Sequence, residues 1–146
     1  MSKTVEYFLS PQSPWCYLGH ARLLELAREK GALVEPKPFD LGKVFTVSGG
    51  LPLAKRAPQR QAYRLVELKR FSESLHAPIN LQPKFFPVAP DDAARLIIAV
   101  EMQDGADAAM HVTDAVLRAV WVNERNIADE ATLATLLRER ELPARR

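Results

Sequence analysis

The stretch VEYFLSPQSPWCYLGH, residues 5–20, decides the fold because it joins a strand to a helix through one short turn. Residues 5–9 are rich in β-branched and aromatic side chains and end at a Ser-Pro-Gln turn, which predicts a buried strand. Ser13 is a natural helix N-cap, and Pro14 suits the first helical position because its missing N–H would be unpaired there. A helix therefore begins here, and its periodicity runs to Gly31.

A second strand is expected at residues 33–39, where apolar and polar residues alternate between prolines typical of a sheet edge. Strand, helix and strand over this length form a parallel βαβ unit. Further helices are predicted at a short segment before Gly49 and at residues 58–75, 91–103, 106–123 and 129–140, with an irregular proline-rich connector at 76–90. The apolar side of the second of these helices comprises Leu65, Leu68, Phe71 and Leu75.

Length and composition favour one soluble domain without a nucleic-acid or membrane partner. The chain has 146 residues, 47% of them hydrophobic, and a net charge of +2. It shows no secretory signal and no long uncharged apolar window, so we expect a cytoplasmic protein. A single cysteine excludes an internal disulfide, and three scattered histidines do not support a metal site.

The segment SPWCYLG, residues 13–19, resembles the active-site motif of the 2-hydroxychromene-2-carboxylate isomerases, a family in the thioredoxin-fold group of DsbA-like proteins and kappa-class glutathione transferases. The stretches KPFDLG and FPV agree with the same branch, and the similarity spans nearly the whole chain. The resemblance implies an α/β fold: a thioredoxin-like βαβ half, residues 1–40, with a large all-helical insert, residues 41–146, in one compact unit. Family members continue with two strands and a helix after a Val-Pro pair, and no such C-terminal ββα segment follows here, so we expect a truncated member.

The family's catalytic serine falls on Ser13. Unpaired N–H groups at a helix N-terminus favour an anion, and in the family this anion is the thiolate of glutathione, which the serine hydroxyl stabilises. The implied reaction is the isomerisation of 2-hydroxychromene-2-carboxylate in aromatic hydrocarbon breakdown, by addition and elimination of the thiolate. Taken alone, a serine before proline is explained by N-capping.

Glutathione and the substrate both carry carboxylates, so cations are expected near Ser13. The proposed glutathione-binding residues are Ser13, Trp15, Lys55 and Arg56, and the proposed substrate-binding residues are Lys43, Arg60, Tyr63 and Phe86. Packing would equally explain the aromatic residues. For Arg64 we predict a solvated helix face, for Ser10 a turn, and for His20 and His111 ordinary helix-face positions.

Three other functions stay open at this point. A kappa-class-like glutathione transferase would share Ser13 and the cofactor. A DsbA-like oxidoreductase would depend on Cys16, although a cysteine one turn into a helix is more often a small buried hydrophobe. A non-catalytic fragment would bind a partner without turnover. We also expect a homodimer, because a two-stranded sheet and the apolar helix around Trp121, itself a core or interface residue, leave surface to cover.

Overall fold

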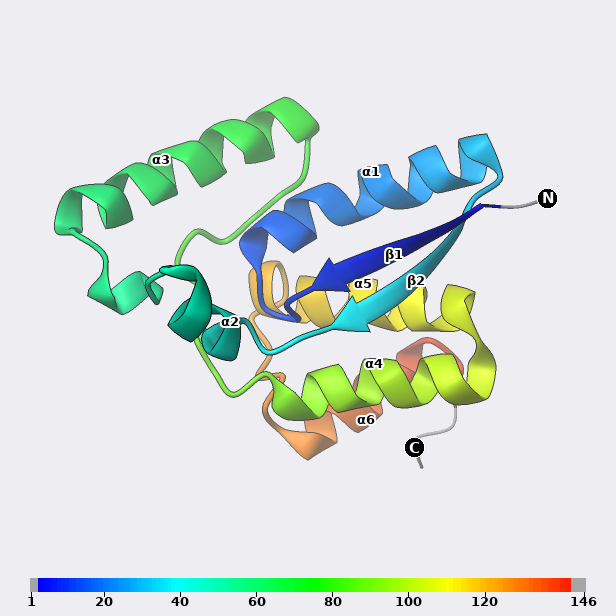
Figure 1. Cartoon of the computed structure of the whole chain (residues 1–146). Coiled ribbons are helices and arrows are strands. Elements are labelled where there is room, and N and C mark those ends of the chain that lie inside the picture. Colours follow the sequence, from blue (N-terminus) through cyan, green and yellow to red (C-terminus); the bar gives the residue numbers. More distant parts are fainter. Residues whose placement is uncertain (1–2, 143–146) are drawn as a thin grey trace.

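The computed structural model describes residues 3–142, which form two strands and a set of helices (Figure 1). The elements in chain order are β1 (Thr4–Leu9), α1 (Pro14–Lys30), β2 (Leu33–Pro38), α2 (Leu41–Ser48), the 3₁₀ turn η1 (Leu53–Lys55), α3 (Pro58–Leu75), α4 (Asp91–Asp104), α5 (Ala106–Trp121) and α6 (Glu130–Glu139). These bounds confirm the predicted elements to within one or two residues. No helix in the described range is both long and apolar enough to cross a membrane.

The opening βαβ unit has the predicted topology. β1 and β2 pair in parallel, with Val5 opposite Val34 and Leu9 opposite Pro38. Between them, α1 begins at the Ser13 cap and ends at Gly31, whose φ of 64° is the left-handed conformation that glycine adopts without strain. The α/β class and the opening parallel βαβ unit expected from the sequence are therefore confirmed.

The prediction that residues 5–9 form a buried strand is wrong, because only one face of the sheet is covered. Successive side chains of a strand point to opposite faces. Val34 lies on the covered face in a cluster with Ala27 of α1 and Met110 of α5, so both helices pack on this side. Phe8 lies on the other face and is 61% exposed. In Figure 1 the strands lie in front of α5, with the uncovered face toward the viewer.

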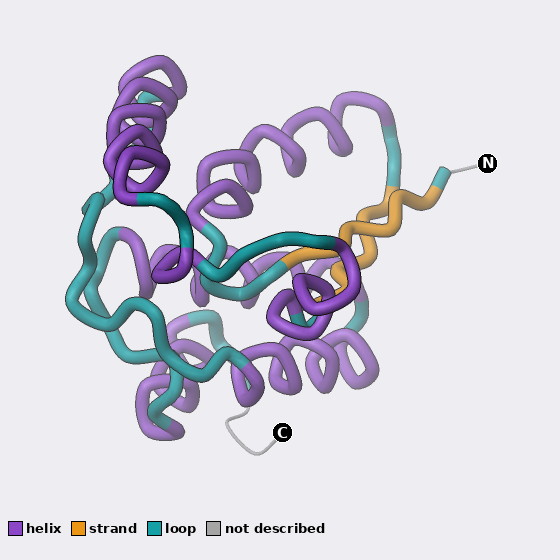
Figure 2. Tube along the Cα trace, turned by 60° about the vertical axis from the view of Figure 1, so that its left-hand side comes forward, coloured by secondary structure: helices purple, strands orange, loops and turns teal. Residues whose placement is uncertain are grey.

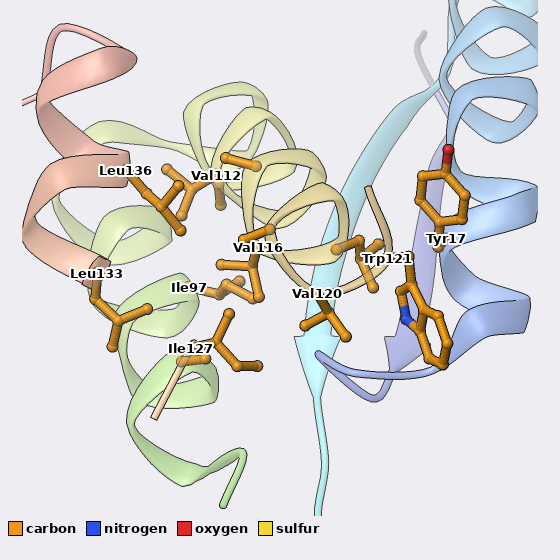
Figure 3. Packing of buried hydrophobic residues seen from close by; sticks show 14 of the residues in the cluster. Tyr17, Ile97, Val112, Val116, Val120, Trp121, Ile127, Leu133 and Leu136 are labelled. Atoms are coloured by element: carbon orange, nitrogen blue, oxygen red, sulfur yellow. The ribbon is translucent and has the colours of Figure 1, made fainter. Parts of the chain in front are cut away.

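The centre of the hydrophobic core is α5, which contacts β2, α1, α4 and α6. Nearly every residue of α5 from Ala109 to Trp121 is buried, and Figure 3 shows its Val116 and Val120 facing Ile97 of α4. Trp121 is completely buried, so it is a core residue. Because β2, α1, α4 and α6 pack around this helix, the expected homodimer stays a prediction that depends on the two-stranded sheet.

Helix α3 stands apart from the block formed by α4, α5 and α6, and it contacts α1 (Figure 1). Leu68 is the fully buried residue of α3, whereas Phe71 on the same side is 48% exposed. The connector at residues 76–90 runs from α3 down to α4 as an irregular loop (Figure 2). The division into residues 1–40 and 41–146 stays a prediction.

Candidate active site at the start of α1

Ser13 occupies the N-cap of α1 with extended backbone angles, φ −75° and ψ 126°. Its Oγ accepts a hydrogen bond from the backbone N–H of Cys16 at 3.2 Å. The hydroxyl proton has no acceptor among the described residues and can be donated to an anion. The first turn of α1 holds no acidic side chain, so the partial positive charge of the helix N-terminus is not neutralised. Ser10, as predicted, closes the preceding turn, and its carbonyl accepts from Ser13 N–H at 3.1 Å.

Cys16, in the first turn of α1, interacts with Tyr7 of β1. Its side chain is half-buried against the core, and its thiol shares a hydrogen bond with the Tyr7 hydroxyl. Burial, followed by the charge and hydrogen bond of Cys16, raises the pKa of Tyr7 far above its usual value, so the phenol stays neutral. Cys16 therefore combines the predicted packing role with a polar partner that the sequence did not reveal.

Gln12, next to Ser13, connects the start of α1 to the proline-rich connector. Its Nε2 donates to the carbonyl of Val88 at 2.8 Å, and its Oε1 accepts from the Val88 N–H at 3.0 Å. This pairing across 76 positions brings Phe86, two residues before Val88, toward the Ser13 end of the helix. The Phe86–Pro87 peptide bond is cis. Gln12 was not among the predicted site residues.

Two aromatic residues of α1 attach it to α3 and the connector. Trp15 is 41% exposed and meets Phe71 of α3 edge-on, with ring centroids 5.7 Å apart. Tyr17 is buried and donates its hydroxyl to the carbonyl of Pro78. Trp15 thus leaves part of its ring facing solvent two residues from Ser13, which suits a residue flanking a ligand site.

Arg64 departs from its predicted solvated position. It is half-buried on α3, and its guanidinium carbon lies 5.6 Å from the ring centroid of Phe86. Phe86 in turn packs against Trp121 with ring centroids 4.8 Å apart. Burial first, and then the positive charge of Arg56, lower the pKa of Arg64 from its ordinary value. The prediction failed because Arg64 lies one helical turn before the buried Leu68, on a side of α3 where Phe86 of the connector covers it.

The other predicted cations and the tyrosine are less closely tied to Ser13. Exposed side chains are found at Lys43 on α2, Lys55 in η1, and Arg60 and Tyr63 on α3. Arg56 is half-buried and donates from Nε to the carbonyl of Leu51 at 2.9 Å. Within residues 3–142 no hydrogen bond, ion pair or ring contact joins these side chains to Ser13, so their assignment stays a prediction.

Two of the histidines differ in their environment. His111 is exposed as predicted, but His20 is 1% exposed, and its Nε2 lies 3.1 Å from the carbonyl of Met110. The prediction for His20 is wrong because α5 covers that side of α1.

A surface hollow of about 410 Å³ lies away from Ser13, between α4 and α6, and contains none of the predicted site residues. The described residues contain no cluster of metal-ligating side chains.

Residues 4–145 match the family profile of the DSBA-like thioredoxin domain. The chain belongs to this family. As a DSBA-like protein it is similar to the 2-hydroxychromene-2-carboxylate isomerase of Sphingobium xenophagum, with 24% identity over 86 residues. That alignment covers 58% of this chain and 44% of the isomerase, so it spans less than half of the relative's length.

Two solved structures of DSBA-like architecture share the fold. A 2-hydroxychromene-2-carboxylate isomerase superposes with a TM-score of 0.76 at 22% identity, covering 97% of this chain and 67% of that protein. The cytosolic disulfide reductase DsbM from Pseudomonas aeruginosa with GSH superposes with a TM-score of 0.65 at 23% identity, covering 95% and 65%. The family suspected from the SPWCYLG segment is confirmed by these matches.

Proposed function

We propose that this DSBA-like protein is a glutathione-dependent isomerase of the 2-hydroxychromene-2-carboxylate type. The observation that carries the proposal is the Ser13 hydroxyl at the N-cap of α1, with a free proton and no acidic residue in the first helical turn. The curated isomerase relative supports the same reaction class, and the reductase solved with GSH supports the cofactor.

The residues around Ser13 fit glutathione. An anion at this position would accept a hydrogen bond from the Ser13 hydroxyl and be stabilised by the helix N-terminus, and both effects favour a thiolate over a thiol. When bound, glutathione supplies a thiolate that adds to a conjugated substrate and later leaves, so that a double bond becomes single for long enough to rotate. The Ser13 hydroxyl would donate a hydrogen bond to the sulfur, and Trp15, which is 41% exposed and two residues away, would flank the bound cofactor. Such a cofactor also suits the cytoplasmic location expected from the sequence.

The kappa-class-like transferase shares this cofactor site and differs in the substrate. The oxidoreductase alternative is weaker, since the sole cysteine, Cys16, is half-buried and its thiol is engaged by Tyr7. A non-catalytic role would require that Ser13 acts as a helix cap alone.

Calorimetric titration with reduced glutathione tests the proposal on the full chain and three variants. Ser13→Ala removes the hydroxyl and should weaken binding at least about tenfold. Ser13→Asp keeps a capping oxygen but places a negative charge at the site, so we expect a stable fold that does not bind glutathione. Cys16→Ala should bind as the wild type does.

Equal glutathione affinity in the wild type and both Ser13 variants would overturn the proposal and leave Ser13 as a cap. Loss of binding on Cys16→Ala instead would favour the oxidoreductase. If binding follows Ser13, turnover of 2-hydroxychromene-2-carboxylate, followed by its absorbance change, separates the isomerase from a transferase that conjugates electrophiles.

A further inference from the structure

Arg64 is a half-buried cation without an anionic partner. It joins no ion pair with any carboxylate of residues 3–142, and none of its N–H groups donates a hydrogen bond within that range. The charge close enough to affect its pKa is the positive one of Arg56. Arginine side chains removed from water normally satisfy several of their five N–H donors. A ligand with acceptor oxygens would supply what the protein does not.

Its position on α3 is that of an apolar residue. Residues 64, 68, 71 and 75 are spaced by three or four, so they share one side of the helix. Leu68 is fully buried, and Phe71 contacts Trp15 of α1. Arg64 lies two turns before Phe71, about 10 Å along the helix axis. The guanidinium therefore faces the same side as the Trp15 contact.

Phe86 holds this guanidinium in place. The guanidinium carbon of Arg64 lies over the ring, 5.6 Å from its centroid, and the ring also packs against Trp121, a fully buried core residue. Stacking on an aromatic ring orients a guanidinium. The N–H groups at the edge of the guanidinium remain free to donate to a carboxylate that lies in the guanidinium plane. Gln12 ties Val88, two residues from Phe86, to the segment that carries Ser13.

From this arrangement we propose that Arg64, stacked on Phe86, binds the carboxylate of a small aromatic acid whose ring lies between α3 and the Ser13 end of α1. The guanidinium supplies a bidentate contact, and Phe86 and Trp15 supply apolar surface. Arg64 is then the residue that selects acids over neutral aromatic compounds, with Arg56 adding positive potential. The reaction that the bound acid undergoes rests on the proposed function. The binding of the acid to Arg64 does not.

Binding of 1-naphthoate and of its neutral isostere 1-naphthamide to the full chain, without glutathione, tests this assignment by calorimetry. We expect the wild type to prefer the acid by at least about tenfold. Arg64→Gln should remove this preference while leaving the affinity for the amide unchanged, and Arg64→Lys should restore part of it. Arg70→Gln, which removes an exposed arginine from another side of the same helix, is the matched control and should bind as the wild type does.

Direct observation in the wild type protects the test against variants that fold poorly. In NMR spectra of the wild type, the arginine Nε–H resonance that disappears in Arg64→Lys belongs to Arg64. This resonance should shift when naphthoate is added. An unchanged resonance, absence of naphthoate binding, or equal acid preference in Arg64→Gln and the wild type would each overturn the assignment. Glutathione carries carboxylates as well. If Arg64→Gln weakens glutathione binding but not naphthoate binding, the aromatic acid is the wrong ligand.

The outcome is separable from that of the proposed function. Ser13→Ala should leave naphthoate binding intact, because its hydroxyl serves the thiolate. Naphthoate binding that depends on Arg64 in a protein that does not bind glutathione would retain this inference and reject the isomerase. Glutathione binding that depends on Ser13, without an acid preference due to Arg64, would do the reverse.

Discussion

Gln12 and Val88 form a reciprocal pair, in which the side-chain amide of Gln12 satisfies both the N–H and the carbonyl of Val88. The pair resembles one rung of a β-ladder made by a side chain, and it joins the residue before Ser13 to the connector that carries Phe86. The position of the connector relative to the start of α1 depends on these two bonds.

Gln12→Ala should lower the free energy of unfolding by about 1 to 3 kcal/mol, because it leaves two backbone groups of a half-buried residue unpaired. Gln12→Glu should destabilise as well, since a carboxylate cannot donate to the Val88 carbonyl. Chemical denaturation measures both. Gln82→Ala, in an exposed part of the same connector, is the control. Equal stability of Gln12→Ala and the wild type would contradict the structural role of the pair.

Ser13→Cys should create a redox-active dithiol with Cys16. Two cysteines separated by two residues at a helix N-terminus form a disulfide readily, and the helix lowers the pKa of the first thiol. After mild oxidation we expect neither thiol to react with Ellman's reagent, and both to return on reduction. The double variant Ser13→Cys/Cys16→Ala keeps one reactive thiol throughout. Two free thiols after oxidation of the single variant would show that the Cys16 sulfur lies too far from the sulfur at position 13 to form a disulfide.

His20 should make the stability of the fold depend on pH. Burial lowers its pKa from 6.5, opposed by a backbone hydrogen bond to Met110 and the charge of Asp114, and assisted by His111 and Arg140. Below pH 6.5 the unfolded chain takes up a proton that the folded chain does not, so stability falls as the pH falls, by at most about 1.4 kcal/mol per pH unit.

The comparison that isolates this effect is the slope of unfolding free energy against pH between about pH 5 and pH 7, where carboxylates contribute less. His20→Gln should flatten the slope, whereas His111→Gln, at an exposed position, should keep it. A slope that persists in His20→Gln would assign the dependence to other groups.

The homodimer expected from the sequence stays a prediction, now based on the uncovered face of the sheet. Phe8 is 61% exposed there, beside the unpaired edge of β1 among the described residues. We expect a dimer by light scattering and a monomer for Phe8→Glu, since a charge would be costly in an apolar interface. Val47→Glu, at an 86% exposed apolar residue of α2, should remain dimeric. A monomeric wild type at micromolar concentration would contradict the expectation.

Local signals in the sequence predicted the elements well. Ser13 before Pro14 fixed the start of α1, Gly31 its end, and Pro58 the start of α3, because caps and prolines act on the backbone within one helical turn. The family could be recognised from the same segment, since its active-site motif is contiguous. The serine of the candidate site was therefore accessible without a structure.

The burial of a side chain and its contact partners could not be predicted from such local signals, because they depend on which elements pack against each other. His20 was expected at an ordinary helix-face position, yet α5, about ninety positions later, covers it. Arg64 was expected in solvent, yet the connector places Phe86 beneath it. Periodicity indicates which side of a helix is apolar, but not how far the neighbouring chain extends over that side.

The sequence by itself therefore determined the order and bounds of the elements, the family, and the capping serine at the start of α1. The tertiary structure alone decided that Gln12 holds Val88, that Tyr7 engages Cys16, and that Arg64 stacks on Phe86 without an anion. The physical reason is the distance along the chain over which each interaction acts. Capping and turn preferences arise between neighbouring residues, whereas these contacts join segments that meet only when α1, α3 and the connector have packed together.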